Sequence, residues 1–183
     1  QLADEGVIFL TLSGGEIFLR KDLFELIAHA RSRGLMVCIK THGGFVGAEE
    51  AERLAALGVS FVHVSYYSHR PEVHDAITRR PGSHKATLAA LKHLVAAGVR
   101  TKVNFTVMKR NLADVIPVIE QCDALGVGVG IGSEILSSHT GQSTPLEVAL
   151  PWEARAEVQA LVEDRTPACT VKGVSNQWGD DLI

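Results

Sequence analysis

The stretch LTLSGGEIFLRKDLFELI, residues 10–27, places two glycines and a glutamate where an apolar run gives way to a helical pattern. Gly14 and Gly15 have no side chains, so their backbone can approach a ligand closely. Their carbonyl oxygens and the Glu16 carboxylate would form a turn rich in hydrogen-bond acceptors. Such a turn suits a cation such as an ammonium group, whereas a phosphate needs donors. The open alternative is that Glu16 only stabilises the start of the following helix through the helix dipole.

This turn belongs to a repeated pattern of strand, turn and amphipathic helix. Apolar runs predict strands at 6–12, 35–41, 59–65, 99–107 and 127–133. Apolar residues at three- and four-residue spacing predict helices at 21–34, 47–58, 83–98, 113–126 and 151–164. Strands that recur roughly every 25 to 40 residues predict an α/β fold with a parallel sheet. The longest connection, 66–83, exceeds a plain βα loop and predicts a short helix or a lid.

Alternation within the strands favours a barrel over a doubly wound sheet. Val103 and Phe105 alternate with Lys102 and Asn104, and the run VGVGIGS at 127–133 alternates valine or isoleucine with glycine. One face of such a strand meets the helices, and the other is polar or empty. Central strands of a doubly wound sheet read instead as continuous apolar runs. We therefore expect an open barrel with a ligand inside.

The overall charge, hydropathy and cysteine content limit which binding partners and which cellular compartment we expect. The net charge of −3 offers no electrostatic reason to expect nucleic acid or an anionic membrane as a partner. No apolar run reaches about 18 residues, and no secretion signal is visible, so we expect no membrane segment. The widely spaced Cys38, Cys122 and Cys169 predict no disulfide framework and a reducing cytoplasm. Because the chain opens on Gln1, we interpret it as a piece of a longer polypeptide.

Several of these stretches resemble the radical S-adenosylmethionine (SAM) superfamily. The SGGEI turn is similar to the family's GGEP motif, with Ile17 in place of proline. KTHG at 40–43 resembles the TNG that ends the family's third strand. Residues 62–111 are similar to the fourth and fifth strands of members with a SPASM or twitch extension, in particular those that modify ribosomally made peptides. The resemblance covers roughly residues 5–170.

The resemblance implies a fold and an activity. Residues 1–165 would form strands two to six of a partial (β/α)6-type barrel, and 166–183 would begin a SPASM/twitch-like module. The family uses a reduced [4Fe–4S] cluster to cleave SAM to a 5′-deoxyadenosyl radical, which abstracts hydrogen from a substrate. The substrate we expect is a peptide, which would receive a crosslink, a thioether or an epimerised centre; a small-molecule substrate is the alternative. An electron donor such as flavodoxin or ferredoxin is also implied.

The resemblance also assigns roles to residues at the carboxyl ends of the strands, where parallel βα folds bind ligands. The implied SAM-binding residues are Gly14, Gly15 and Glu16 for the methionyl ammonium, Ser65 for the ribose or carboxylate, Lys102 and Asn104 on the inward face, and Ile135 or Leu136 for the adenine. Lys40, His42 and Tyr67 are candidates for the substrate pocket. The alternative for Ser65 and Asn104 is a purely structural hydrogen bond in a wet barrel.

The family's CxxxCxxC cluster loop is absent from this chain, and we expect it upstream of Gln1. Cluster ligation needs several thiolates in close array, which Cys38 and Cys122 cannot provide. Cys122 lies on a helical pattern and is expected to be a small buried residue. Cys169 resembles the first ligand of an auxiliary iron–sulfur cluster, whose other ligands would lie beyond Ile183.

Two other classes of function remain open at this point. One is a cluster-free barrel that binds a peptide or nucleotide without chemistry. The other is a metal-dependent barrel hydrolase, suggested by His63, His69 and His74 around the predicted strand 59–65. A hydrolase would require paired histidines on an early strand or metal ligands at several strand ends.

Overall fold

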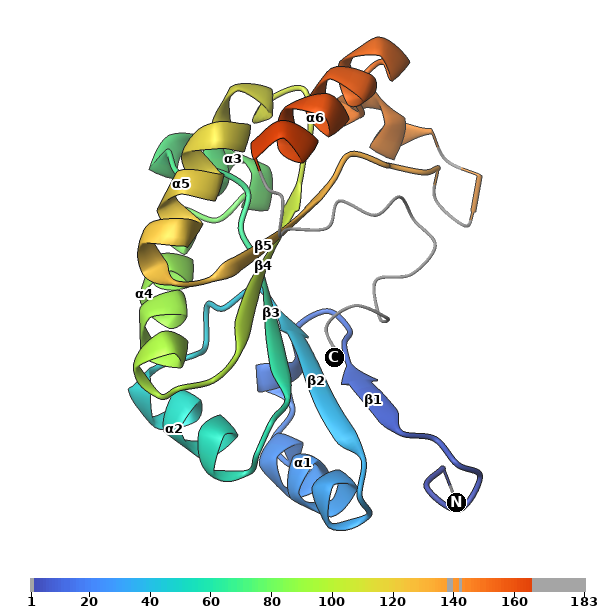
Figure 1. Ribbon diagram of the computed structural model, residues 1–183, viewed down its shortest axis with the longest axis vertical. Helices are drawn as coiled ribbons and strands as arrows, with labels where there is room; N and C mark the ends of the chain where they lie inside the picture. The colour runs from blue at the N-terminus through green and yellow to red at the C-terminus, as the bar shows by residue number, and fades with distance from the viewer. Residues whose placement is uncertain (1, 138–139, 142, 166–183) are drawn as a thin grey trace.

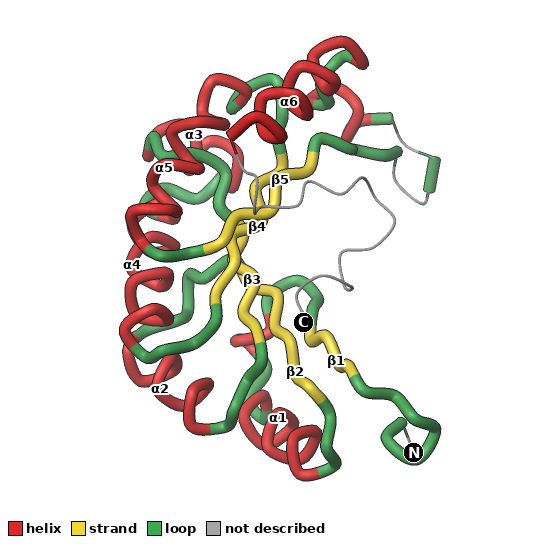
Figure 2. Tube along the Cα trace, in the orientation of Figure 1, coloured by secondary structure: helices red, strands yellow, loops and turns green. Residues whose placement is uncertain are grey.

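The computed structural model describes residues 2–137, 140–141 and 143–165, in which one curved parallel sheet carries helices along one side (Figures 1 and 2). The strands are β1 (Phe9–Leu12), β2 (Met36–Thr41), β3 (Phe61–Ser65), β4 (Thr101–Thr106) and β5 (Gly128–Gly132). They lie in the order β1-β2-β3-β4-β5, each parallel to the next. A doubly wound sheet reverses its strand order at a switch point. The sequential order therefore confirms a barrel-type sheet, and each predicted strand is present.

The helices that follow the strands also lie where the periodicity predicts them. They are α1 (Leu23–Ser32), α2 (Ala48–Ala56), α3 (Pro71–Thr78), α4 (Ser83–Ala96), α5 (Val115–Leu125) and α6 (Trp152–Arg165), with short 3₁₀ turns at Ile17–Leu19, Leu112–Asp114 and Thr144–Val148. Helix α3 is the short helix predicted inside the long connection, and Pro71 opens it. No helix in the described ranges is long and apolar enough to cross a membrane.

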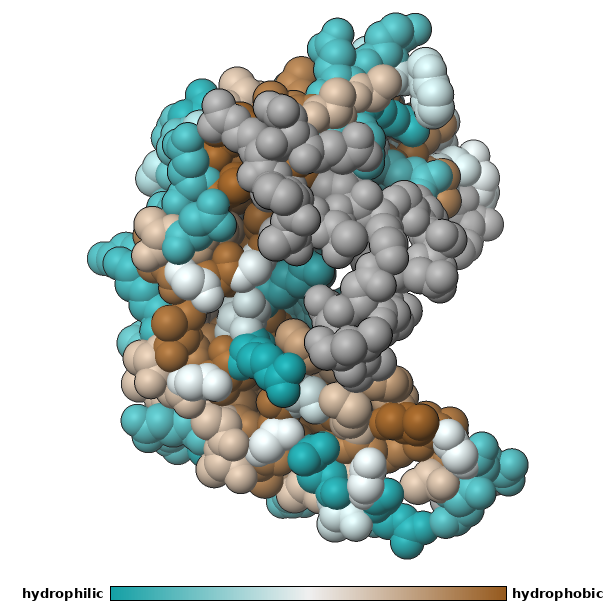
Figure 3. Space-filling model, viewed as in Figure 1, coloured by the Kyte–Doolittle hydropathy of each residue, from teal (hydrophilic) through white to brown (hydrophobic). Residues whose placement is uncertain are grey.

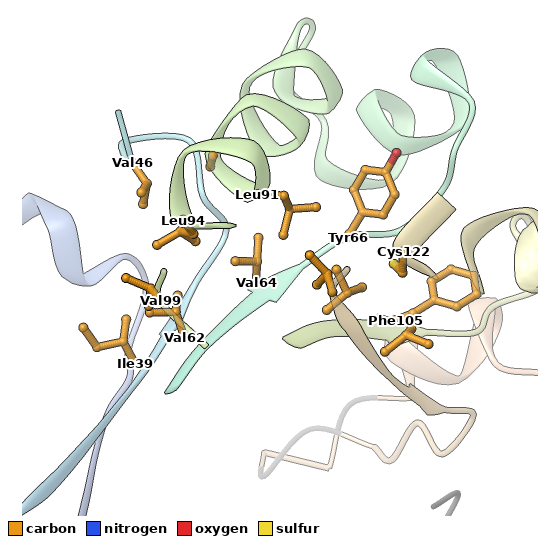
Figure 4. Packing of buried hydrophobic residues seen from close by; sticks show 14 of the residues in the cluster. Ile39, Val46, Val62, Val64, Tyr66, Leu91, Leu94, Val99, Phe105 and Cys122 are labelled. Carbon is orange, nitrogen blue, oxygen red and sulfur yellow. The ribbon is translucent and has the colours of Figure 1, made fainter. Parts of the chain in front are cut away.

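The hydrophobic core lies between the sheet and its helices. Val62 and Val64 of β3 are fully buried, and Leu91 and Leu94 of α4 pack over them (Figure 4). Full burial of such a side chain is worth roughly 1.5–3 kcal/mol. Hydrophilic residues gather along the outer margin of the molecule, over the helices (Figure 3). The valines predicted to face the helices do so. Because side chains alternate along a strand, the residues between these valines lie on the opposite face of the sheet.

That opposite, concave face carries polar side chains and glycines in register. One row runs Lys40, His63, Lys102, Gly128. The next runs Ser65, Asn104, Gly130. Residues paired across neighbouring strands point to the same side of a sheet. The alternation therefore separates a helix-packed face from a face with room for a ligand.

One backbone position in this scaffold is strained. Arg79 ends α3 with φ 56°, in the left-handed region, where a side chain costs about 1 kcal/mol. We expect Arg79→Gly to raise the free energy of unfolding by about 0.5–1 kcal/mol, since glycine's greater freedom in the unfolded chain offsets part of the gain. Urea denaturation would measure it. Ala97→Gly, at a helix end with φ −79°, is the control and should give no gain; an equal gain there would contradict the strain argument.

Candidate functional site

The Glu16 carboxylate is buried and joins the ends of β1 and β2. Only 4% of the Glu16 side chain is exposed. Its oxygens accept hydrogen bonds from Thr41 Oγ1 at 2.8 and 2.9 Å and from the His42 backbone N–H at 3.0 Å. It also caps the 3₁₀ turn through Phe18 N at 3.2 Å. Protein donors therefore occupy most of the roughly four acceptor positions of a carboxylate.

His42 completes the environment of this carboxylate. Its Nδ1 accepts a hydrogen bond from Gly44 N at 2.9 Å, so the ring proton of the neutral imidazole lies on Nε2. Nε2 is 3.1 Å from Glu16 Oε2 and donates to it. A Cβ atom on Gly44 would lie 2.9 Å from the His42 ring, so only glycine lets the ring fold back over this loop. The sequence contained KTHGG, but nothing in it showed that Glu16 is the partner of Thr41 and His42.

The backbone of the turn itself is open. Gly14 and Gly15 are exposed, and a Cβ atom added at either would meet nothing within 4 Å. Gly14 has φ +155°, which side-chain-bearing residues rarely adopt. With the Glu16 carboxylate engaged by the protein, the carbonyl oxygens of these two exposed glycines are the remaining candidate acceptors of the turn. This arrangement is compatible with an ammonium group, although the cation prediction now rests on the carbonyls more than on the carboxylate.

The other predicted SAM-binding residues divide into two groups. Ser65, Lys102 and Asn104 lie together on the concave face, as expected, and His63 Nδ1 is 3.4 Å from Asn104 Oδ1. A Cβ atom at Gly132 of β5 would meet nothing within 4 Å, so this end of the face has room. The open glycines of the turn and Gly132 at the end of β5 fit a bound SAM. Ile135 and Leu136 follow β5, where Leu136 is 70% exposed, and their contact with the adenine stays a prediction.

Of the predicted pocket residues, Lys40 faces the concave side, whereas His42 and Tyr67 lie beyond the strand ends. The Tyr67 N–H donates to His74 Nδ1 at 3.2 Å. Its carbonyl accepts from Asn111 Nδ2 at 2.8 Å. The backbone of Tyr67 is therefore held by its neighbours.

A cavity of about 220 Å³ lies beside His42. Its lining residues come from the loop after β2, the end of β3, helix α3, the turn that follows it, and helix α4: His42, Gly44, Ser65, His74, Thr78, Arg80, Ser83, Ala86 and Thr87. The Arg80 guanidinium lies 5.6 Å from the ring centre of Phe45 at the same loop. Sequence reasoning missed Arg80, Thr78 and Ser83; the unusual length of the 66–83 connection was the signal that could have found them.

Two buried polar residues missed in the sequence brace the ends of β3 and β4. Asn111, fully buried, donates to the carbonyls of Tyr67 and Thr106 and accepts from Met108 N at 2.7 Å. Asp114, also buried, binds Arg70 through two hydrogen bonds of 2.8 and 3.0 Å. Hydrogen bonds to these donors and acceptors offset the free-energy cost of burying the polar groups. They hold the loops at the carboxyl edge of the sheet.

The described thiols do not fit an iron–sulfur cluster. Cys38 lies on the concave face of β2, in register with Thr11 and Phe61, whereas Cys122 lies in the core on α5. Within the ranges that the structure describes, no group of three His, Cys, Asp or Glu residues could hold a metal ion. Cys169 and the predicted module at 166–183 fall outside these ranges.

The histidines behind the hydrolase hypothesis lie in three different environments. His63 is on the concave face, and His69 Nδ1 is 3.0 Å from the buried Asp114 Oδ1. His74 is buried beside Tyr66 and His84. Burial, with a smaller contribution from the charge of His84, lowers the pKa of His74 to about 4. These three side chains therefore do not form a metal site.

His74 predicts a pH dependence of stability. In the unfolded chain its pKa is 6.5, against about 4 in the fold, so between these values the unfolded state binds an extra proton. Stability from His74 is fully present above pH 6.5 and is lost as the pH falls toward 4. We expect His74→Gln to weaken this decrease by on the order of 2 kcal/mol in urea denaturation across the window. The exposed His29→Gln should keep the wild-type profile; an unchanged profile in His74→Gln would refute the prediction.

The contact between Glu16 and Thr41 predicts a second effect on stability. Thr41→Val removes the hydroxyl that donates to Glu16 and accepts from Gly43 N at 3.0 Å. The variant should lose about 1–3 kcal/mol of unfolding free energy, because the Glu16 carboxylate loses one of its donors and the Gly43 N–H is left without its acceptor. Thr41→Ser keeps the hydroxyl and should lose less than half as much, so equal losses in the two variants would contradict the hydrogen-bond argument.

Comparison with known proteins identifies the chain's family. Residues 1–122 match the family described as the radical SAM superfamily. An AdoMet-dependent heme synthase of Methanosarcina barkeri is 36% identical over 126 residues, which are 69% of this chain and 36% of that protein. The sporulation killing factor maturation protein SkfB of Bacillus subtilis is 30% identical over 182 residues, 100% of this chain and 42% of SkfB.

The fold is shared with solved structures as well. The structure of anSMEcpe with bound AdoMet and the Cp18Cys peptide superposes with a TM-score of 0.72 at 14% identity, covering 89% of this chain and 48% of that one. The chain spans less than half the length of each of these three proteins. Since the family match extends over most of the sequence, the chain belongs to the radical SAM superfamily, whose members use SAM and a [4Fe–4S] cluster.

Proposed function

We propose that this chain is the central part of a radical SAM enzyme that modifies a peptide, by a crosslink, a thioether or epimerisation. The observation that carries the proposal is the open backbone turn at Gly14 and Gly15, beside a concave sheet face whose last strand is lined with glycine. Similarity to SkfB, a maturation protein, along the whole chain supports a peptide as the substrate. We further propose that the protein acts in the cytoplasm, with a donor such as flavodoxin or ferredoxin.

When bound, SAM supplies the 5′-deoxyadenosyl radical that takes a hydrogen atom from the substrate. The contribution of this chain is binding and orientation. The carbonyls of Gly14 and Gly15 would accept hydrogen bonds from the methionyl ammonium. The buried Glu16 carboxylate holds those carbonyls in place, because Thr41 and His42 fix it from the neighbouring strand.

The concave face would hold the rest of SAM and the substrate. Gly128, Gly130 and Gly132 remove side-chain bulk from β5, while Ser65 and Asn104 supply polar groups in the middle of the sheet. The fully buried core on the other side of the strands keeps this face rigid. A rigid wall suits radical chemistry, because the radical must meet one carbon of the substrate and be kept from water.

The primary cluster has to be held by other residues. Cys38 and Cys122 do not form a thiolate array, so we propose that the ligands lie outside the described residues, in a CxxxCxxC loop upstream of Gln1. Cys169 stays a candidate ligand of an auxiliary cluster.

Gly15 allows a direct test. The full-length protein that contains this chain would be reconstituted anaerobically with iron and sulfide, then mixed with SAM and dithionite. We expect 5′-deoxyadenosine to form. In Gly15→Val the added side chain would enter open space and block the ligand without a clash in the fold, so SAM affinity should fall more than about tenfold.

Ala89→Val, at an exposed position of α4, is the control for added bulk and should bind SAM as the wild type does. Thermal unfolding of both variants would check that they fold. A wild-type protein that carries its cluster and yet forms no 5′-deoxyadenosine would overturn the proposed function. An unchanged affinity in folded Gly15→Val would remove the turn from the SAM site.

A further inference from the structure

The concave face carries a row of basic side chains that cofactor binding alone does not explain. Strand register aligns Lys40 of β2 with His63 of β3, His63 with Lys102 of β4, and Lys102 with Gly128 of β5. The basic side chains therefore share the face that points away from the helices. All three are half-buried. Two lysines and a histidine thus line one continuous strip of the barrel wall.

The Lys102 side chain runs along the glycines of β5. A Cβ atom added at Gly128 would lie 3.8 Å from Lys102 Cγ, and one at Gly130 would lie 3.1 Å from Lys102 Cε. Gly130 is nearer the carboxyl end of β5, so the stem of Lys102 extends toward the mouth of the barrel. The same Cβ at Gly130 would be 3.8 Å from Asn104 Oδ1, which brings the Lys102 ammonium to the level of Asn104.

Asn104, in the neighbouring row, orients the His63 ring. Its Nδ1 is 3.4 Å from Asn104 Oδ1, and because a carbonyl oxygen can only accept, Nδ1 carries a proton. His63 lies between Lys40 and Lys102 in the register. The row therefore combines two charged donors with an imidazole held in a defined direction.

The spacing of the row suits a small anion. Neighbouring strands are about 4.8 Å apart, so the backbones of Lys40 and Lys102 are roughly 10 Å apart. The flexible four-carbon stems of two lysines can converge across that distance on one carboxylate. The strands themselves contain neither Asp nor Glu, so they give this face a basic character. A carboxylate placed between the two ammonium groups would be attracted by both.

We propose that Lys40, His63 and Lys102 hold the side-chain carboxylate of an acidic residue in the peptide substrate. This inference rests on the proposed function and specifies its substrate. Binding the carboxylate would place the neighbouring carbon atoms of the peptide at a fixed position in the barrel. The enzyme would then select peptides with an acidic group close to the residue it modifies.

The methionyl carboxylate of SAM fits this row less well. That carboxylate is attached to the same carbon as the ammonium expected at Gly14 and Gly15, directly after β1. Lys102 lies on β4, three strand spacings or roughly 14 Å from β1. Lys40, on the strand next to β1, is the member of the row nearest to it in strand order. The substrate is therefore the better source of a carboxylate that engages both ends of the row.

The test compares matched peptide libraries on the full-length protein that contains this chain, loaded with its cluster and SAM. The libraries are short synthetic peptides with one fixed position, Glu, Gln or Lys, and random residues elsewhere. Mass spectrometry would quantify the peptides of each library that stay bound to the protein. We expect the wild type to retain the Glu library about tenfold over the Gln library. Lys40→Met and Lys102→Met should bring this ratio close to one, and Lys102→Glu should shift retention toward the Lys library.

Lys92→Met, on the exposed side of α4, is the matched control and should keep the wild-type ratio. Equal retention of the Glu and Gln libraries by the wild type, or no retention of either, would overturn the inference. So would an unchanged ratio in folded Lys102→Met. Formation of 5′-deoxyadenosine by the wild type is measured in parallel: its absence refutes the proposed function, whereas its presence without a preference for Glu refutes only the carboxylate site.

Discussion

A buried carboxylate at the junction of two strands is the interaction on which the site depends. Burying the charge of Glu16 would be costly without donors, and Thr41 and His42 provide them from the end of β2. The end of β1 is thereby tied to the end of β2. The short segment between Leu12 and Glu16 makes its turn through the exposed Gly14 and Gly15. A polar contact that looks structural thus determines which acceptors remain for a ligand.

The rest of the barrel wall follows from the two faces of a parallel strand. Val103 and Phe105 pack under the helices, so Lys102 and Asn104 have no alternative but to face the concavity. On β5, Gly128 and Gly130 make room for the Lys102 side chain, and Gly132 leaves the carboxyl end of the strand open. At the carboxyl edge, where loops would otherwise move, Asn111 holds the carbonyls at the ends of β3 and β4. The core and the open face are consequences of one alternating pattern, and Asn111 braces the edge where the strands end.

Much of this architecture could be predicted from the sequence because it depends on local periodicity. Alternation in TKVNFT and GVGIG identified both the strands and the face that stays polar, and the length of the 66–83 connection predicted α3. The partners of Glu16 could not be predicted, since they depend on the register of β1 against β2, which places Thr41 beyond Leu12. The burial of His74 against Tyr66 and His84 was equally hidden, because it arises from the packing of α3 on α4.

The central claim is that the Gly14–Glu16 turn recognises an ammonium group through backbone carbonyls. The most direct measurement is the affinity of the cluster-loaded full-length protein for SAM and for an analogue that lacks only the amino group, by isothermal titration calorimetry. A charged donor at two or more carbonyls should be worth about 1.5–3 kcal/mol, so the analogue should bind at least about tenfold more weakly. Equal affinities for the two compounds would contradict the claim and leave the turn with a structural role alone.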